Sequence, residues 1–126
     1  MPAHVVHANE TRRTETPNAV MTTLASPTLS NTRDFSVWQV DLGAGARGPV
    51  HVMDSEQVWT ILAGDASCVV EDVRYDLTEG DTIRITGGVT RQFAATTDTR
   101  FLVCGRSDAQ ASTPTSEHPV TPPWIA

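Results

Sequence analysis

Two polar side chains that could do chemistry on a small molecule, an imidazole and an amide, lie close together in the stretch 45–64. The imidazole of His51 could act as a general base or bind a metal ion. The amide of Gln57 could orient a substrate by hydrogen bonding. A single histidine taken without further context is more often structural than catalytic. The chemistry therefore depends on what shares a face with these two groups.

Alternating apolar and polar residues predict a strand at 50–53 and another at 57–62, because successive side chains of a strand point to opposite faces. Asp54-Ser55 between them predicts a tight turn, since both side chains can bond their own backbone. If this hairpin closes, the imidazole and the amide share one inner face with apolar side chains. That face holds His51, Met53, Gln57, Trp59 and Ile61.

The spacing of this stretch resembles the first motif of the cupin family. That motif reads Gly, five residues, His-x-His, three or four residues, Glu, six residues, Gly. Here Gly45 is followed after five residues by His51-x-Met53, after three more by Gln57 and after six more by Gly64. Of the two histidines and one glutamate of this motif, only the histidine at 51 is present.

A second frame resembles the second motif of the same family, which reads Gly, five residues, Pro-x-Gly, two residues, His, three residues, Asn. Fifteen residues separate the two frames, a spacing typical of small microbial cupins. The resemblance covers roughly residues 35 to 105 and implies an all-β fold, the double-stranded β-helix or jelly-roll barrel. The matching positions are Gly80, Thr86, Gly88, Arg91 and Ala95.

The resemblance also identifies four positions that would hold a metal ion in metal-binding cupins, namely 51, 53, 57 and 91. Met53 is a soft ligand suited mainly to copper, and Arg91 has no lone pair and would repel a cation. We therefore predict no cofactor. If a divalent transition metal does bind, His51 and Gln57 would be its ligands.

A metal-free pocket is the alternative that these residues favour. The cupin frame points Arg91 inward, where its buried charge needs an acceptor, such as a carboxylate, a phosphate or an enolate. His51 beside it would be kept neutral and could act as a base, and Gln57 would orient the substrate. The same Arg91 could instead extend out of the barrel mouth to water or a surface acid. Apolar walls would come from Met53, Trp59, Ile61 and Phe93.

Two classes of function fit this constellation. The first is an enzyme that transfers a proton next to a carbonyl, as an isomerase, a lyase or a polyketide cyclase does, with His51, Arg91 and Gln57 as catalytic residues. The second is a non-catalytic protein that binds or senses a small molecule. In both, the ligand would be anionic or carbonyl-containing, and the sequence does not separate the two classes.

Composition sets the remaining limits. The chain has 126 residues, enough for one domain with its own core. A net charge of −6 disfavours nucleic acid as a partner. No apolar run approaches the ~18 residues of a membrane span, and the N-terminal sequence does not resemble a signal peptide. We expect a cytoplasmic protein without a membrane partner and, as for many cupins, a homodimer.

Turn signals divide the chain into an N-terminal arm at 1–18, a barrel domain at 19–106 and a tail at 107–126 rich in Pro, Ser and Thr. The segment 4–6 could add an edge strand or stay loose, and Trp124-Ile125 could dock or belong to a disordered tail. Cys68 and Cys104 fit core packing better than a disulfide. The strands are predicted at 19–25, 35–42, 50–53, 57–62, 66–73, 75–77, 82–85, 90–95 and 100–105.

Overall fold

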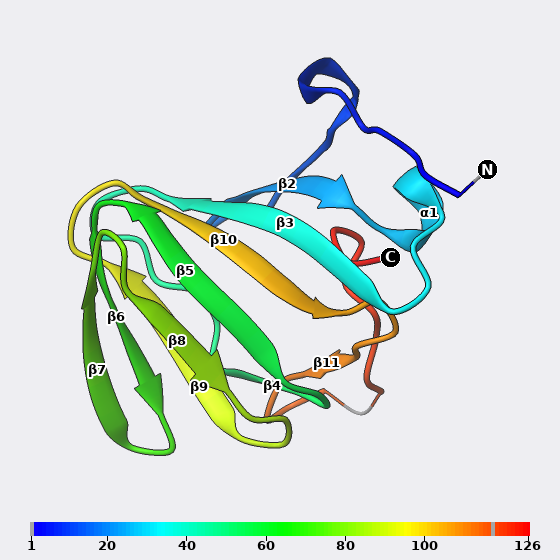
Figure 1. Ribbon diagram of the computed structural model, residues 1–126. Helices are drawn as coiled ribbons and strands as arrows, with labels where there is room; N and C mark the ends of the chain where they lie inside the picture. The colour runs from blue at the N-terminus through cyan, green and yellow to red at the C-terminus, as the bar shows by residue number, and fades with distance from the viewer. Residues whose placement is uncertain (1, 117) are drawn as a thin grey trace.

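Two antiparallel β-sheets form the fold in this computed structural model, which describes residues 2–116 and 118–126 (Figure 1). The strands are β1 (Arg12–Glu15), β2 (Val20–Ala25), β3 (Phe35–Leu42), β4 (His51–Met53), β5 (Gln57–Ala63), β6 (Asp65–Val70), β7 (Val73–Thr78), β8 (Thr82–Ile85), β9 (Thr90–Ala95), β10 (Thr99–Arg106) and β11 (Ala111–Ser112). Within the described residues, one sheet has the order β1-β2-β3-β10-β5-β8 and the other the order β11-β4-β9-β6-β7. The predicted all-β double-stranded β-helix is confirmed.

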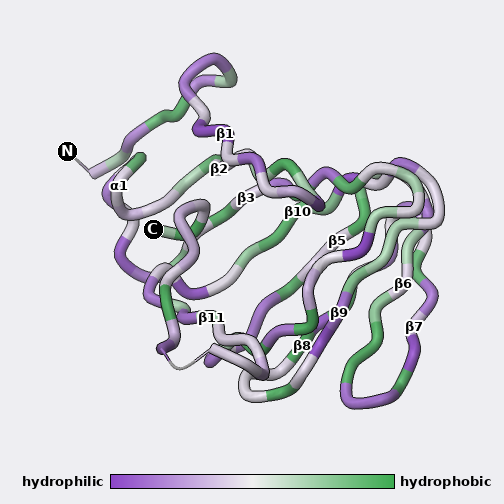
Figure 2. Tube along the Cα trace, turned by 180° about the vertical axis from the view of Figure 1, so that it is seen from behind, coloured by the Kyte–Doolittle hydropathy of each residue, from purple (hydrophilic) through white to green (hydrophobic). Residues whose placement is uncertain are grey.

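The core lies between the inner faces of the two sheets. Hydrophobic stretches run along the strands of both sheets (Figure 2), and in β3 every second side chain is buried. Three rings join the sheets at the centre: Trp59 stacks on Phe93 with ring centroids 4.1 Å apart, and Phe101 meets each of them edge-on at 5.2 Å. Aromatic pairs in these geometries add to the stability gained from area burial alone.

The hairpin between β6 and β7 turns earlier than the sequence predicts. Glu71 and Asp72 form the turn with φ of 46° and 69°. This left-handed conformation matches the twist of the flanking strands, and glycine or asparagine usually signals it. Because neither is present here, the pattern extended the first strand wrongly to residue 73.

The N-terminal segment contributes a strand where the sequence did not predict one. β1 pairs with β2 from Arg12↔Thr23 to Glu15↔Val20, whereas residues 4–6 form no strand. β1 is polar and lacks apolar alternation, so its ladder to β2 holds it together with hydrogen bonds from the Arg12 guanidinium.

A single helical turn, α1 (Pro27–Ser30), lies between the strands predicted at 19–25 and 35–42, where no helix was predicted. Ser26 Oγ accepts from the Leu29 N–H, and Pro27 occupies the first helical position. Asn31 ends the turn with φ of 58°. The signals are therefore present in the sequence, but a four-residue helix has no apolar periodicity to reveal it.

The end of the chain, residues 118–126, packs onto the inner side of β2 and β3, and we call it the C-terminal segment (red in Figure 1). Ile125 is 1% exposed, and a bridge joins Ala111 to Val120. Side chains from outside the segment donate to its main-chain oxygens: Thr23 Oγ1 to Trp124, Ser36 Oγ to Ile125, Thr28 Oγ1 to Ala126, and Arg12 Nη2 to both Pro123 and Ala126.

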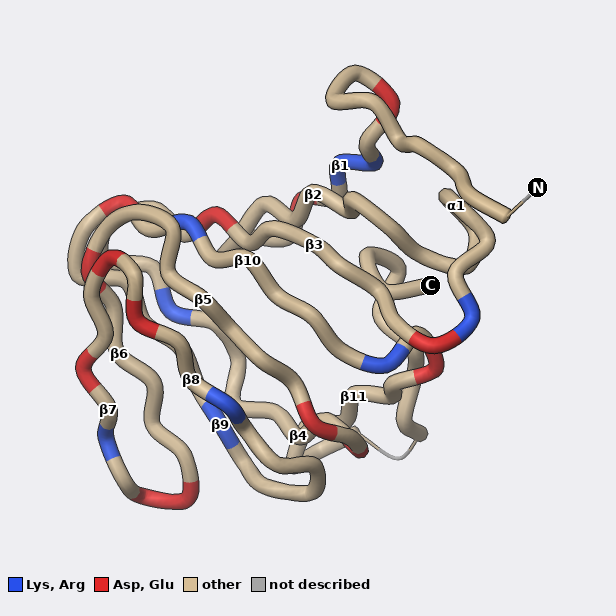
Figure 3. Tube along the Cα trace, in the orientation of Figure 1, with Lys and Arg blue, Asp and Glu red and all other residues tan. Residues whose placement is uncertain are grey.

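Charged residues are spread over several elements, and the arginines do not gather on one strand or loop (Figure 3). The helices of the described residues are the 3-10 helix η1 (Ala8–Glu10) and α1, and neither has the length and apolar character needed to cross a membrane. Cys68 is buried, Cys104 is half-buried, and both are free thiols, in line with the core packing expected of them.

Candidate small-molecule site

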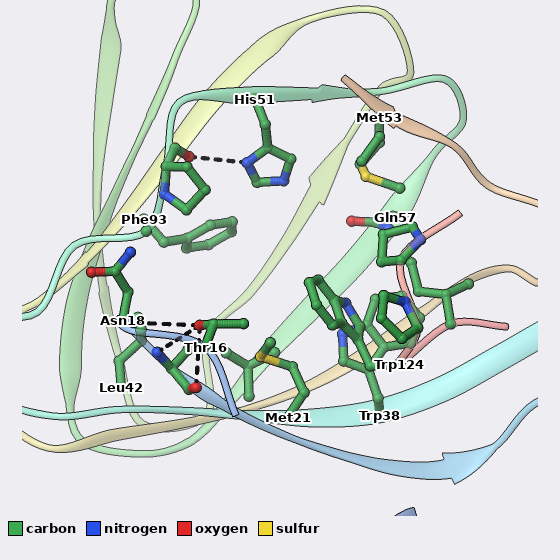
Figure 4. Close-up of a pocket in the computed structure, with 18 of the residues that line it drawn as sticks. Thr16, Asn18, Met21, Trp38, Leu42, His51, Met53, Gln57, Phe93 and Trp124 are labelled. Atoms are coloured by element: carbon green, nitrogen blue, oxygen red, sulfur yellow. Dashed lines mark hydrogen bonds between the residues drawn. The ribbon is translucent and has the colours of Figure 1, made fainter. Parts of the chain in front are cut away.

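A cavity of about 420 Å³ lies between the two sheets at the end of the barrel closed by the C-terminal segment. Figure 4 shows His51 and Met53 on one side of it and Met21 and Trp38 on the opposite side. The lining is overwhelmingly apolar, and its size is that of a pocket for a small organic molecule. Trp124 and Ile125 of the C-terminal segment complete the lining.

The turn between β4 and β5 positions the polar side chains. Asp54 Oδ1 accepts from the Gln110 N–H, and the Asp54 N–H donates to the Gln110 carbonyl. These two bonds join the turn to the residue directly before β11. A Cβ on Gly87 would lie 2.8 Å from Asp54 O and from Ser55 N. This close approach of two turns requires glycine at 87 and fixes where β5 starts, and so where Gln57 lies.

A hydrogen-bond network joins the three polar residues of the site. Arg91 Nε donates to His51 Nε2 at 3.2 Å, and Arg91 Nη2 donates to Gln57 Oε1 at 2.5 Å. Trp59 Nε1 donates to the same Gln57 oxygen at 3.1 Å. His51 Nδ1 lies 3.0 Å from Pro49 O. Arg91 can only donate, so His51 Nε2 must be the acceptor, and the Pro49 carbonyl can only accept, so His51 Nδ1 must carry the proton. The imidazole is therefore the neutral tautomer with its proton on Nδ1.

Burial is the largest influence on the pKa values of the titratable groups in the barrel, and for His51 the charge of Arg91 adds to it. Burial, followed by the nearby Arg91 charge, lowers the pKa of His51, which keeps the imidazole neutral. Burial lowers the pKa of Arg91 to about 10, so the guanidinium stays protonated at neutral pH. Burial also raises the pKa of the Cys68 thiol to about 11. No Asp or Glu of the described residues forms an ion pair with Arg91. The barrel therefore holds one positive charge with neutral partners.

The structure brings most of the predicted site residues to the cavity. The lining includes His51, Met53, Gln57, Trp59 and Phe93. Arg91 and Ile61, each 1% exposed, are not part of the lining. Arg91 points inward, but its guanidinium lies behind His51 and Gln57. It does not extend to water, which answers the alternative left open by the sequence.

Sequence reasoning missed the opposite side of the cavity. Met21 of β2 and Trp38 of β3 line it, and so does Trp124. Trp38 could have been found, because the alternation of β3 places it on the same face as Val40 and Leu42. Trp124 carries no such signal, since no periodicity surrounds it.

The residues at the four cupin ligand positions do not fit a metal ion. The one imidazole lone pair, on His51 Nε2, accepts from Arg91 Nε, and Gln57 Oε1 accepts from two donors. A guanidinium that is a permanent cation occupies the fourth position. Over the described residues no group of three or more His, Cys, Asp or Glu side chains could hold a metal. The site therefore has no free ligand set for a hard divalent cation.

The neutral His51 makes stability depend on pH. A lowered folded-state pKa means that the unfolded chain takes up a proton on His51 before the folded protein does, so stability falls as pH drops below about 6.5. His51→Gln keeps an acceptor for Arg91 and does not titrate. We expect the variant to gain stability relative to the parent below this pH, by up to about 1.4 kcal/mol per pH unit. Urea unfolding at pH 7.5, 6.5 and 5.5 measures the free energy of unfolding of both proteins. A difference between them that does not change with pH would contradict the lowered pKa of His51.

Comparison with known proteins places this geometry in a family. The family described as "Cupin domain" matches residues 38–104. An RmlC-like cupin from Shewanella frigidimarina is 18% identical, with a TM-score of 0.71 over 82% of this chain and 90% of that chain. The protein KdgF from a Halomonas species is 17% identical, with a TM-score of 0.71 over 82% and 93% of the two chains.

A third similar structure belongs to a larger protein. Salicylate 1,2-dioxygenase from Pseudoaminobacter salicylatoxidans is 15% identical, with a TM-score of 0.71 over 83% of this chain and 31% of that chain. No curated protein matches the sequence. At these identities the likeness concerns the fold, so the function has to come from the site itself.

Proposed function

Because the chain belongs to the cupin family, we propose that its barrel binds a small apolar molecule carrying an anionic oxygen, without the help of a metal ion. The observation that carries the proposal is the buried Arg91, whose protein partners are the neutral His51 and Gln57. A buried charge without a counter-ion is costly, and an anionic ligand would compensate it. The apolar lining and the volume of about 420 Å³ suit the rest of such a molecule.

Binding without catalysis is the form of this function that the geometry favours. Both ring nitrogens of His51 are already engaged, one by Pro49 O and one by Arg91 Nε. A general base needs a free lone pair within reach of the substrate proton. The network therefore supports a binder or sensor.

Proton transfer next to a carbonyl is the second candidate, as in an isomerase, a lyase or a cyclase. One observation favours it: the imidazole of His51 lies at the cavity and is held neutral, which is the state a base needs. It would require the bond between Arg91 Nε and His51 Nε2 to break when substrate binds. Deuterium exchange at the α-carbon of a bound ketone, lost in His51→Gln, would support this candidate over the binder.

The charge of the ligand can be tested with two probes of matched shape. 2-Naphthoate is an anion, and 2-naphthamide is its neutral analogue. We expect the parent to bind 2-naphthoate about tenfold or more tightly than 2-naphthamide by isothermal titration. In Arg91→Met, which removes the charge but keeps apolar volume, this preference should disappear while 2-naphthamide binds within about threefold of the parent.

The outcomes of this test are distinct. Failure of the parent to bind either probe would contradict a small-molecule site of this kind. Equal affinity for the two probes in the parent would contradict the role of the Arg91 charge. Circular dichroism and thermal melting of Arg91→Met show whether the variant keeps the fold, and a folded variant that still prefers 2-naphthoate would also overturn the proposal.

A further inference from the structure

Strand β7 is an uncovered edge of the five-stranded sheet. Among residues 2–116 and 118–126 it pairs only with β6, and it is the last strand in the order β11-β4-β9-β6-β7. It lies at the outer margin of the molecule in Figure 1 and in the reverse view of Figure 2. Val73 and Tyr75 are 53% and 45% exposed. Exposed edges readily pair with another strand, and β7 has none of the bulges, prolines or lysines that usually prevent it.

The register of the β6–β7 hairpin shows which main-chain groups of β7 point to the free edge. In an antiparallel sheet, alternate residues of a strand direct their N–H and C=O groups to opposite neighbours. At the two ends of β6, Asp65 O accepts from the Thr96 N–H at 2.9 Å and the Glu71 N–H donates to Thr90 O at 3.2 Å. The odd-numbered residues of β6 therefore face β9, and its even-numbered residues face β7. Because the register pairs these with odd-numbered residues of β7, the even-numbered residues of β7 face the free edge.

Two of these edge-facing residues offer main-chain groups to a partner strand. The third, Thr78, is already engaged, because its N–H donates to Asp81 Oδ2 and its carbonyl accepts from the Asp81 N–H. Within residues 2–116 and 118–126 no hydrogen bond reaches the edge-facing N–H and C=O groups of Arg74 and Asp76. These two residues can therefore donate to and accept from another strand.

The charges of Arg74 and Asp76 make this edge complementary to itself. The two side chains are 65% and 78% exposed and lie on one face of the strand, with Arg74 Nε 2.9 Å from Asp76 Oδ1. If two copies of β7 pair antiparallel about a two-fold axis at Tyr75, Arg74 lies opposite Asp76 of the second copy, and the two exchange main-chain hydrogen bonds. An axis at residue 74 or 76 would place identical charges directly opposite each other, which is unfavourable.

From this edge we propose that the protein forms a homodimer through β7, with the two-fold axis at Tyr75 and the five-stranded sheets of both copies joined into one. On the face opposite the charges, Tyr75 meets Tyr75 of the second copy, and Val73 meets Leu77. Cross-strand pairs of this kind stabilise antiparallel sheets. No residue of β7 lines the cavity, so the interface and the ligand site are independent of each other.

Sedimentation velocity of the parent over a range of about 1 to about 300 µM tests the interface. We expect a reversible monomer–dimer equilibrium with a Kd of about 1–100 µM, because an interface built on one strand is small. A parent that stays monomeric over the whole range would overturn the proposal.

Two charge reversals test the register. Asp76→Arg puts two arginines on the edge, and Arg74→Asp puts two aspartates there. Each variant alone should dimerise at least about tenfold more weakly than the parent, because like charges then lie opposite each other. An equimolar mixture of the two should form a heterodimer about as tightly as the parent dimerises, because the axis at Tyr75 then pairs opposite charges on both sides.

Circular dichroism and thermal melting establish that both variants are folded. Single variants that dimerise like the parent, or a mixture of folded variants that stays monomeric, would contradict the proposal.

Asp108→Arg is the matched control for these reversals. Asp108 also pairs with an arginine two residues away on an exposed surface, with Arg106 Nη2 2.8 Å from Asp108 Oδ2, and neither residue lies on β7. The variant makes the same change in net charge and should dimerise like the parent. A loss of dimer in Asp108→Arg as large as in Asp76→Arg would show that net charge governs association, and the β7 interface would be refuted.

Discussion

The triple variant Met53→His, Gln57→Glu, Arg91→His should bind nickel or zinc at least about a hundredfold more tightly than the parent. His51, Met53 and Gln57 line one cavity, and Arg91 reaches two of them from the neighbouring strand. The substitutions supply three imidazoles and a carboxylate, remove the repelling charge and free the lone pair on His51 Nε2. Neutral imidazoles are good ligands for both metals.

Two measurements check this expectation. Isothermal titration with nickel gives the affinity directly. Metal that binds only the folded protein at a hundred times its dissociation constant adds about 2.7 kcal/mol of stability, which corresponds to a rise in melting temperature of about 10 °C. The double variant Met53→His, Gln57→Glu, which keeps Arg91, is the control and should bind much more weakly. A folded triple variant with no gain in affinity would mean that the four positions do not converge.

Gly64→Ala should be among the most damaging single substitutions in the chain. Gly64 has φ of +93°, and an added Cβ would lie 2.8 Å from Thr99 Oγ1, 2.9 Å from Thr99 Cα and closer still to Asp98 O. The left-handed backbone disfavours alanine, and the neighbouring main chain cannot move aside. We expect a loss of about 3–5 kcal/mol in the free energy of unfolding.

Gly45→Ala is the matched control for this substitution. Gly45 has a similar φ of +82°, but a Cβ there would have no atom of the described residues within 4 Å. Only the backbone cost of about 1–2 kcal/mol should remain. Urea unfolding of the two variants beside the parent measures the difference. Similar losses in both would show that backbone conformation, and not the contact with Thr99, decides the effect at residue 64.

The barrel and one side of its cavity could be predicted because both depend on spacing and alternation. The spacing of residues between Gly45 and Gly64 predicted the hairpin of β4 and β5. Strand alternation predicted that Met53, Gln57 and Trp59 point into the barrel. Both signals are local and repeat along the chain. The turn at Glu71-Asp72 was missed because its backbone conformation is held by the hairpin and is not marked by residue type.

The roles within the site were harder to predict than the positions. Alternation indicates that Arg91 points inward, but it does not indicate where a long side chain ends. Its end is set by the acceptors on two other strands, His51 Nε2 and Gln57 Oε1. The same contacts engage the lone pair that a base would need. Trp38 shows the converse: its face was predictable, but that its N–H has no partner among residues 2–116 and 118–126 follows only from the three-dimensional packing.

The attachment of the C-terminal segment has a consequence for how ligand preference can change. Thr23, Ser36, Thr28 and Arg12 hold the segment through its main-chain oxygens, which every residue type supplies. The side chains of Trp124 and Ile125 face the cavity. Substitution at these two positions can therefore alter the size and shape of ligand accepted while the segment keeps its anchorage. The polar side chains of Arg91, His51 and Gln57 lie on the strands, so substitution in the C-terminal segment leaves their hydrogen bonds in place.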